Sequence, residues 1–136
     1  MAPLLLDTCA VLWIANGEEI SEDCRRAVDE AAPSDQILIS PITAWEIGIL
    51  SKKGRFKSRF TPQHWFEHLM SAPSTALAPL TPEILLESSF LPGKMTDDPA
   101  DRIIAATARE YGYTVMTRDK ALLDYGSEGH LSVLEC

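Results

Sequence analysis

The chain lacks the features that would assign it to a membrane, secreted or disulfide-stabilised class of protein. None of its apolar runs approaches the ~20 residues that a membrane-spanning helix requires. Its first residues, Met1-Ala2-Pro3, carry no basic segment of the kind that begins a secretory signal. Its three cysteines are widely spaced and form no C-x-x-C pair, which argues against a disulfide framework or a structural zinc site. A cytoplasmic protein is therefore expected, with no membrane association.

Repeats, low-complexity tracts and linkers are also missing from the sequence. The 136 residues are expected to form one domain, 1–136, with a sizeable core. Apolar residues make up 46% of the chain and charged residues 24%, which is ordinary for a globular protein. Cys9, Cys24 and Cys136 are expected to be small buried apolar residues rather than reactive thiols.

The net charge of −8 at first argues against a nucleic-acid partner. However, one stretch of the sequence lacks acidic residues altogether. No acidic residue occurs between Glu46 and Glu67. Five basic residues fall within eight positions of this gap, here called the basic segment: Lys52, Lys53, Arg55, Lys57 and Arg59. The rest of the chain contains seven basic residues and all twenty acidic ones. The sequence therefore describes an acidic body with one basic segment.

Short apolar runs alternate with helical patterns along the chain. Five runs predict strands, at 4–6, 37–39, 76–80, 114–116 and 131–134. Helical spacing or helix-start signals such as Asp98-Pro99 predict helices over 9–15, 22–32, 41–50, 62–70, 82–90 and 99–111. Strands that alternate with helices favour an α/β fold, a three-layer α/β/α sandwich around a mainly parallel sheet.

Four acidic residues occupy positions from which their side chains can converge. Asp7 and Asp119 each follow a predicted strand, and sites in open α/β sheets form beyond the carboxyl ends of strands. Glu46 and Asp101 lie on otherwise apolar faces of predicted helices. Any one of these acids more often has a structural role, such as capping a turn or a helix. The joint pattern favours a site.

Charge dictates the chemistry of such a site. Clustered carboxylates repel one another, so some stay protonated unless a cation joins them. Ligand sets made only of oxygen suit Mg²⁺ or Mn²⁺ rather than zinc or copper. One or two such ions can polarise a phosphate and activate a water molecule. The hydroxyls of Thr8 and Thr117, beside Asp7 and Asp119, could orient a carboxylate or hold a metal-bound water, or could simply cap turns.

The acids lie within four stretches, 4–8, 40–47, 98–108 and 117–119, that resemble the PIN-domain nucleases. The likeness is closest to VapC-type toxins of bacterial toxin–antitoxin pairs, and it covers essentially the whole chain. It implies a Mg²⁺- or Mn²⁺-dependent endoribonuclease whose acidic quartet is Asp7, Glu46, Asp101 and Asp119. Thr117 matches the family's hydroxyl residue near the metals, with Thr8 and Asp98 as further neighbours of the quartet.

The sequence departs from the family pattern at two positions, and the resemblance also implies binding partners. Many relatives carry an aromatic residue where Ala100 stands and a histidine near Thr96, so the pocket wall and substrate choice could differ. The resemblance implies a cognate antitoxin that blocks the acidic pocket and a homodimer formed through helical faces. The basic segment, interleaved with Phe56 and Phe60, suits either RNA phosphates and unstacked bases or an acidic segment of a protein partner.

Other functions compete with the nuclease hypothesis. His64-x-x-Glu67-His68 matches an inverted zinc-protease motif, with both histidines one turn apart on a predicted helix. The chain is small for a protease. In the alternative, structural interpretation of this motif, Trp65 and its apolar neighbours pack inward while the histidines face water. A non-catalytic module with the same fold would be signalled by a missing acid, and none is missing. A phosphatase with an Asp7 nucleophile would carry a second acid two positions on, where Cys9 stands.

Overall fold

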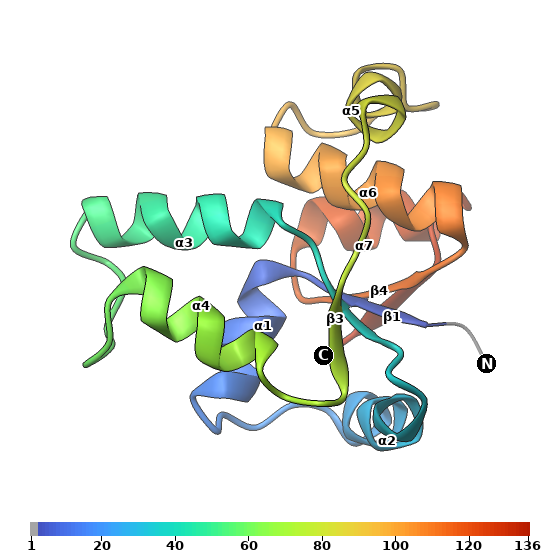
Figure 1. Ribbon diagram of the computed structural model, residues 1–136. Coiled ribbons are helices and arrows are strands. Elements are labelled where there is room, and N and C mark those ends of the chain that lie inside the picture. The colour runs from blue at the N-terminus through green and yellow to red at the C-terminus, as the bar shows by residue number, and fades with distance from the viewer. Residues whose placement is uncertain (1–2) are drawn as a thin grey trace.

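The centre of the molecule is a parallel β-sheet, seen in a computed structural model that describes residues 3–136 (Figure 1). Within these residues the sheet has five strands in the spatial order β3-β2-β1-β4-β5. The strands are β1 (Leu4–Leu6), β2 (Ile37–Ile39), β3 (Thr75–Leu77), β4 (Thr114–Thr117) and β5 (Val133–Glu135). Every neighbouring pair is parallel. The chain winds outward from β1 to β3 and then returns to build the other half, so the winding direction reverses between β1 and β4.

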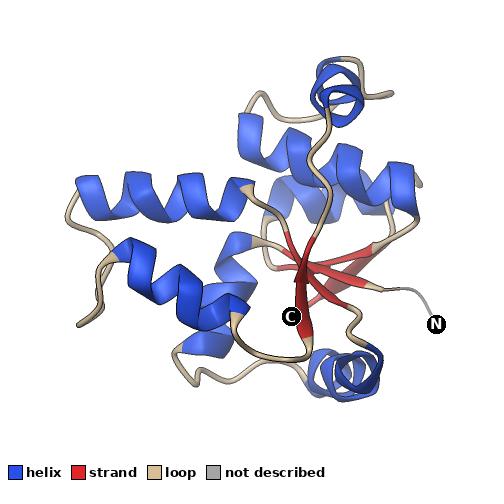
Figure 2. Ribbon diagram, viewed as in Figure 1, coloured by secondary structure: helices blue, strands red, loops and turns tan. Residues whose placement is uncertain are grey.

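Helices cover both faces of this sheet, as Figure 2 shows with strands in red and helices in blue. Because successive strand residues point to opposite faces, Leu4 and Leu6 enter one core and Leu5 enters the other. The first core packs against α1 (Thr8–Ala15), α2 (Glu22–Ala31) and α4 (Pro62–Met70). The second packs against α6 (Pro99–Tyr111) and α7 (Lys120–Ser127). The predicted three-layer α/β/α sandwich is confirmed.

Side-chain caps fix where several predicted helices begin and end. Ser21, Thr61 and Thr81 accept backbone N–H groups at the starts of α2, α4 and α5 (Pro82–Ser89). Asp98 caps α6, and Gly112 ends that helix at a φ of 73°, a left-handed conformation that glycine adopts without a steric penalty. These boundaries are confirmed because a capping hydrogen bond depends on local sequence.

Some boundaries differ from the prediction. The helix expected from Pro41 is α3 (Ile42–Lys52), and the Ser40 hydroxyl accepts the N–H of Ile42 at 3.1 Å in the turn before it. The strands expected over 76–80 and 131–134 are β3 and β5, displaced to 75–77 and 133–135. Cys24 and Cys136 are buried as predicted, whereas Cys9 is exposed, because it faces outward from the first turn of α1.

Helix α7 was missing from the prediction. Gly126 lies in its last turn, where a Cβ would come within 2.4 Å of Val133 Cγ2 in β5. The glycine is thus needed for close packing of helix against strand. In the part of the chain that the structure describes, no helix is long and apolar enough to cross a membrane. The expectation that no leader is present rests partly on Met1 and Ala2, which lie outside the described residues.

Candidate active site

Asp7 lies where the winding of the sheet reverses. It follows β1, next to β4, and this topological switch point is where open α/β sheets form their sites. One carboxylate oxygen accepts the N–H of Thr8 at 2.7 Å, and the other accepts the Thr117 hydroxyl at 2.8 Å. Only 4% of Asp7 is exposed. Burial and two donors hold this carboxylate in one orientation.

Thr117 links Asp7 to the acid that follows the neighbouring strand. The hydroxyl that donates to Asp7 also accepts the backbone N–H of Asp119 at 2.9 Å. Asp119 caps α7, and its Oδ2 accepts the N–H of Leu122 at 3.1 Å. One buried hydroxyl therefore fixes the spacing of two strand ends.

Glu46 reaches the same region from α3. The Thr8 hydroxyl donates to Glu46 Oε1 and lies 3.1 Å from the hydroxyl oxygen of Thr43. Because Thr8 gives its single proton to Glu46, Thr43 must be the donor in the second bond. Thr43 is fully buried, and sequence reasoning missed it. Its position three residues before Glu46 on one helix face was the available signal.

The start of α6 supplies the remaining acids. Asp98 Oδ1 accepts the N–H groups of Ala100 and Asp101 at 2.9 and 3.3 Å. The preceding loop is tied down by Arg102, which donates to the carbonyls of Ser88 at 2.7 Å and Thr96 at 3.0 Å. This clamp, which the sequence did not reveal, holds the loop that leads to Asp98.

The pKa values of three carboxyl groups rise because these acids are buried together. Burial, together with the charges of Asp119, Asp98, Asp7 and Glu46, raises the pKa of Asp101 to about 8. Burial is likewise the main cause that raises the pKa of Asp7, partly offset by the hydrogen bonds from Thr117 and Thr8. The pKa of Glu46 is raised by burial, offset in part by Thr8, and by the neighbouring acids. The structure thus places all four predicted acids and Asp98 close enough for the charges of the others to raise the pKa of Asp101.

This cluster suits a hard cation. Its donors are carboxylate and hydroxyl oxygens, and a divalent cation would relieve the repulsion that raises these pKa values. Residues 3–136 contain no group of three or more histidine, cysteine, aspartate or glutamate side chains placed so that together they could hold a metal ion. Mg²⁺ does not require such a group, because it usually keeps several waters and takes one or two carboxylates together with substrate phosphates.

The exposed basic segment spans the last turn of α3 and the loop that follows. Lys53 lines a groove that also contains Glu46. Lys57 and Arg59 instead line a separate cavity of about 480 Å³ beside Trp65. The structure therefore brings one end of the basic segment to the acids and directs the other end away.

The histidines of the alternative zinc motif face outward from α4. The ring of Phe60 stacks with that of His64, with centroids 4.9 Å apart, and with that of His68 at 6.5 Å. Trp65 and Phe66 pack toward the core, as the structural interpretation of this motif expects. A zinc site needs three or four protein ligands, and the described residues provide no such group here.

Residues 4–128 match the family model of the PIN domain. The chain belongs to the PIN domain family. This PIN domain is 29% identical to Ribonuclease VapC22 of Mycobacterium tuberculosis (strain ATCC 25618 / H37Rv) over 123 residues, which cover 90% of this chain and 91% of the relative. The resemblance predicted from four short stretches is thereby confirmed.

Solved structures share the same fold. VapBC2 from Rickettsia felis, bound to a DNA fragment from their promoter, has a TM-score of 0.68 and 16% identity, covering 97% of both chains. PAE2754 from Pyrobaculum aerophilum has a TM-score of 0.63 and 18% identity, covering 98% of this chain and 89% of that one. At such identities the likeness shows the fold alone.

Proposed function

We propose that this PIN domain is a Mg²⁺- or Mn²⁺-dependent endoribonuclease. The observation that carries the proposal is the convergence of four acids on the β1–β4 switch point, where burial and mutual repulsion raise the pKa of Asp101 to about 8. Asp7, Asp101 and Asp119 would hold the ion, directly or through water, and Glu46 would be a further ligand or position the attacking water. When bound, the ion polarises the phosphate and lowers the pKa of that water.

The protein's own groups prepare this reaction before any ion arrives. Thr117 fixes the orientation of Asp7, and Thr8 holds Glu46 through its hydroxyl. Asp98 fixes the first turn of α6, which carries Asp101. Preorganised acids of this kind would hold a cation with little reorganisation, and the cation would stabilise the charge that develops on a phosphate. The similarity to a protein named Ribonuclease VapC22 supports RNA as the substrate.

The test compares Asp7→Asn with Asp29→Asn, a matched change at an exposed residue of α2. Asparagine is also a good N-cap, so α1 is expected to form normally in the Asp7 variant. Asp7→Asn should lose RNA cleavage in Mg²⁺ while its circular dichroism spectrum stays native. Full cleavage by this variant would contradict the proposal.

A metal-exchange arm separates the nuclease from the zinc hypothesis. EDTA should abolish cleavage, and Mg²⁺ or Mn²⁺ rather than Zn²⁺ should restore it, whereas His64→Ala should cleave RNA normally. Restoration by Zn²⁺ together with loss in His64→Ala would favour the zinc hydrolase. A folded chain that binds RNA but never cleaves it would favour the non-catalytic module.

We further propose that the protein is the toxin of a toxin–antitoxin pair, with a cognate antitoxin that occupies the acidic site. The family membership and the fold shared with VapBC2 from Rickettsia felis support this role. Co-expression with the protein encoded by the adjacent gene tests it: growth arrest caused by the chain alone should be relieved, and the two proteins should copurify.

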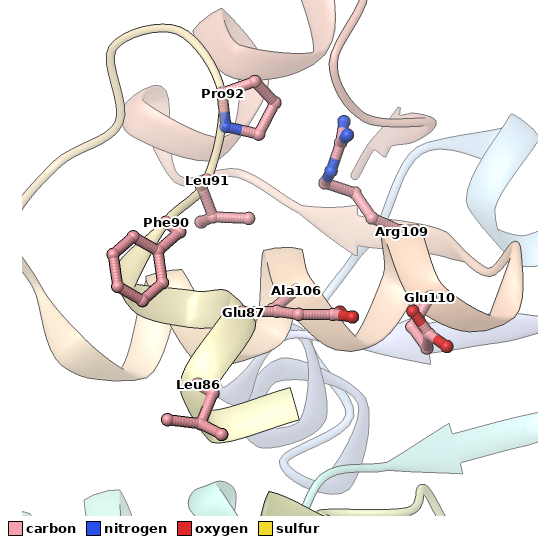
Figure 3. A pocket seen from close by; sticks show the side chains of 8 residues that line it. All are labelled: Leu86, Glu87, Phe90, Leu91, Pro92, Ala106, Arg109 and Glu110. Atoms are coloured by element: carbon pink, nitrogen blue, oxygen red, sulfur yellow. The ribbon is translucent and has the colours of Figure 1, made fainter. Parts of the chain in front are cut away.

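Self-association is proposed to use the α5–α6 face. Leu86 and Phe90 are 66% and 82% exposed there. Figure 3 shows them on the apolar side of a cavity of about 380 Å³, with Glu87, Arg109 and Glu110 on its charged side. Desolvation and the carboxylate of Glu110 raise the pKa of Glu87. A two-fold axis here would cover the apolar residues and bring each Arg109 against the partner's acids, which makes the face self-complementary.

A further inference from the structure

A groove of about 360 Å³ extends from the acidic cluster along α1 and α3. It shares Thr8, Glu46 and Asp98 with that cluster. Its walls also include Trp45, Ile49 and Lys53. The groove therefore begins at the proposed reaction centre and ends at the basic segment.

Trp45 is the prominent aromatic surface in this groove. Its side chain precedes Glu46 directly in the sequence, yet the residue is 52% exposed. Ile49 and Lys53 follow at intervals of four residues, so all three share one face of the helix and its C-cap. Lys53 lies about 12 Å beyond Trp45 along the helix axis, from the rise of ~1.5 Å per residue. An acid cluster, an indole ring and an ammonium group thus line the same groove.

We propose that this groove binds the nucleotide next to the scissile phosphate of single-stranded RNA, with its base stacked on Trp45 and a following phosphate held by Lys53. The inference rests on the proposed nuclease function and adds a subsite to it. A strand whose phosphodiester reaches the acids must continue across the surface, and this groove leads from them to cationic groups. Unpaired bases are recognised by stacking on aromatic side chains and by basic groups that follow the backbone.

The wall opposite Trp45 suits an uncharged base. Cys9 and Leu12 of α1 line the groove and bring no cationic side chain to it. Because every base has a π face, the stack should tolerate any sequence, and contacts outside the groove would have to determine sequence preference.

The test measures binding of a fluorescently labelled RNA hexanucleotide in Mg²⁺ on an Asp7→Asn background, which keeps the RNA intact. Trp45→Ala should weaken binding roughly 5- to 150-fold, the loss expected for one base–aromatic stack, and Trp45→Phe should recover most of it. Tyr111→Ala, at an exposed aromatic residue on α6, is the matched control and should bind normally. Lys53→Ala should reduce the slope of log K against log salt by about 0.7, the value for one phosphate of a single strand.

An RNA that lacks the base at one position distinguishes stacking from a structural role. The abasic position is moved along the hexanucleotide, and each RNA is bound to the Asp7→Asn protein with Trp45 in place. At one abasic position, this protein should bind the RNA as weakly as the Trp45→Ala variant binds the intact RNA. At that site, Trp45→Ala should have no further effect. Equal losses for intact and abasic RNA would overturn the inference, as would unchanged RNA binding by Trp45→Ala together with lost antitoxin binding. If the parent protein neither binds nor cleaves RNA, the proposed function itself fails.

Discussion

Replacing Asp101 by asparagine should stabilise the metal-free protein at pH 8 and leave its stability nearly unchanged at pH 4. The pKa of Asp101 is about 8 in the folded protein, against an ordinary value of 3.8. Between these values the folded state binds a proton that the unfolded state has released, so the free energy of unfolding falls as pH rises. Below pH 3.8 Asp101 is protonated in both states and does not lower the free energy of unfolding. The free energy of unfolding then falls as the pH rises to 8, where Asp101 ionises in the folded protein.

The magnitude follows from the size of the pKa shift. Each pKa unit corresponds to about 1.36 kcal/mol, which sets an upper bound of about 5 kcal/mol on the cost of charging Asp101 at pH 8. Because this carboxylate is only partly buried, solvent screening reduces the cost below that bound. The asparagine loses a favourable interaction between a first-turn carboxylate and the helix dipole, worth about 0.3–1 kcal/mol. The electrostatic relief is larger than this loss. The free energy of unfolding of Asp101→Asn should therefore exceed that of the parent protein by more than 1 kcal/mol at pH 8.

Urea unfolding in EDTA, followed by tryptophan fluorescence at pH 4, 6 and 8, measures this difference. Asp29→Asn, on the exposed face of α2, should show the same difference from the parent at all three pH values. Adding Mg²⁺ should stabilise the parent protein and have little effect on Asp101→Asn, because ligands stabilise only the state that binds them. A destabilised Asp101→Asn at pH 8, or a difference independent of pH, would refute the electrostatic account.

Other parts of the site and surface give further predictions. Neutralising Lys52, Lys53 and Arg55 together should weaken RNA binding and flatten its salt dependence in anisotropy titrations; if only antitoxin binding weakens, the basic segment belongs to the protein partner. Thr43→Val should lower the cleavage rate, because it removes the donor to the hydroxyl that holds Glu46, and Thr43→Ser should restore it; equal rates would contradict this role. Phe90→Ser should shift sedimentation from dimer to monomer, and an unchanged dimer would place self-association elsewhere.

The fold and the position of the four acids were predictable because both follow from local sequence. Three consecutive leucines ended by Asp7 identify a buried strand and its carboxyl end. The Asp98 cap and Gly112 define α6 in the same way. Helix α7 has a local start signal in its Asp119 cap, which the prediction missed. The glycine at 126, by contrast, is explained only by its contact with Val133 in a distant strand.

Two features of the site likewise depend on tertiary structure alone. The hydroxyl of Thr43 meets that of Thr8 across 35 positions of sequence. Its spacing from Glu46 places it on the same helix face, but only the tertiary fold brings it to Thr8. The division of the basic segment is the second feature. Its residues are neighbours in the sequence, but the turn after α3 sends Lys53 and Arg59 to different cavities.

The Thr117 hydroxyl has a consequence for how this scaffold could be re-engineered. It couples the acids that follow the neighbouring strands β1 and β4, so the geometry of the acidic cluster is set deep inside the domain. Trp45 and the basic segment lie on the periphery, on one helix and one loop. Under the proposed function, a library that varies those outer positions would change which RNA is bound while leaving the acidic cluster intact.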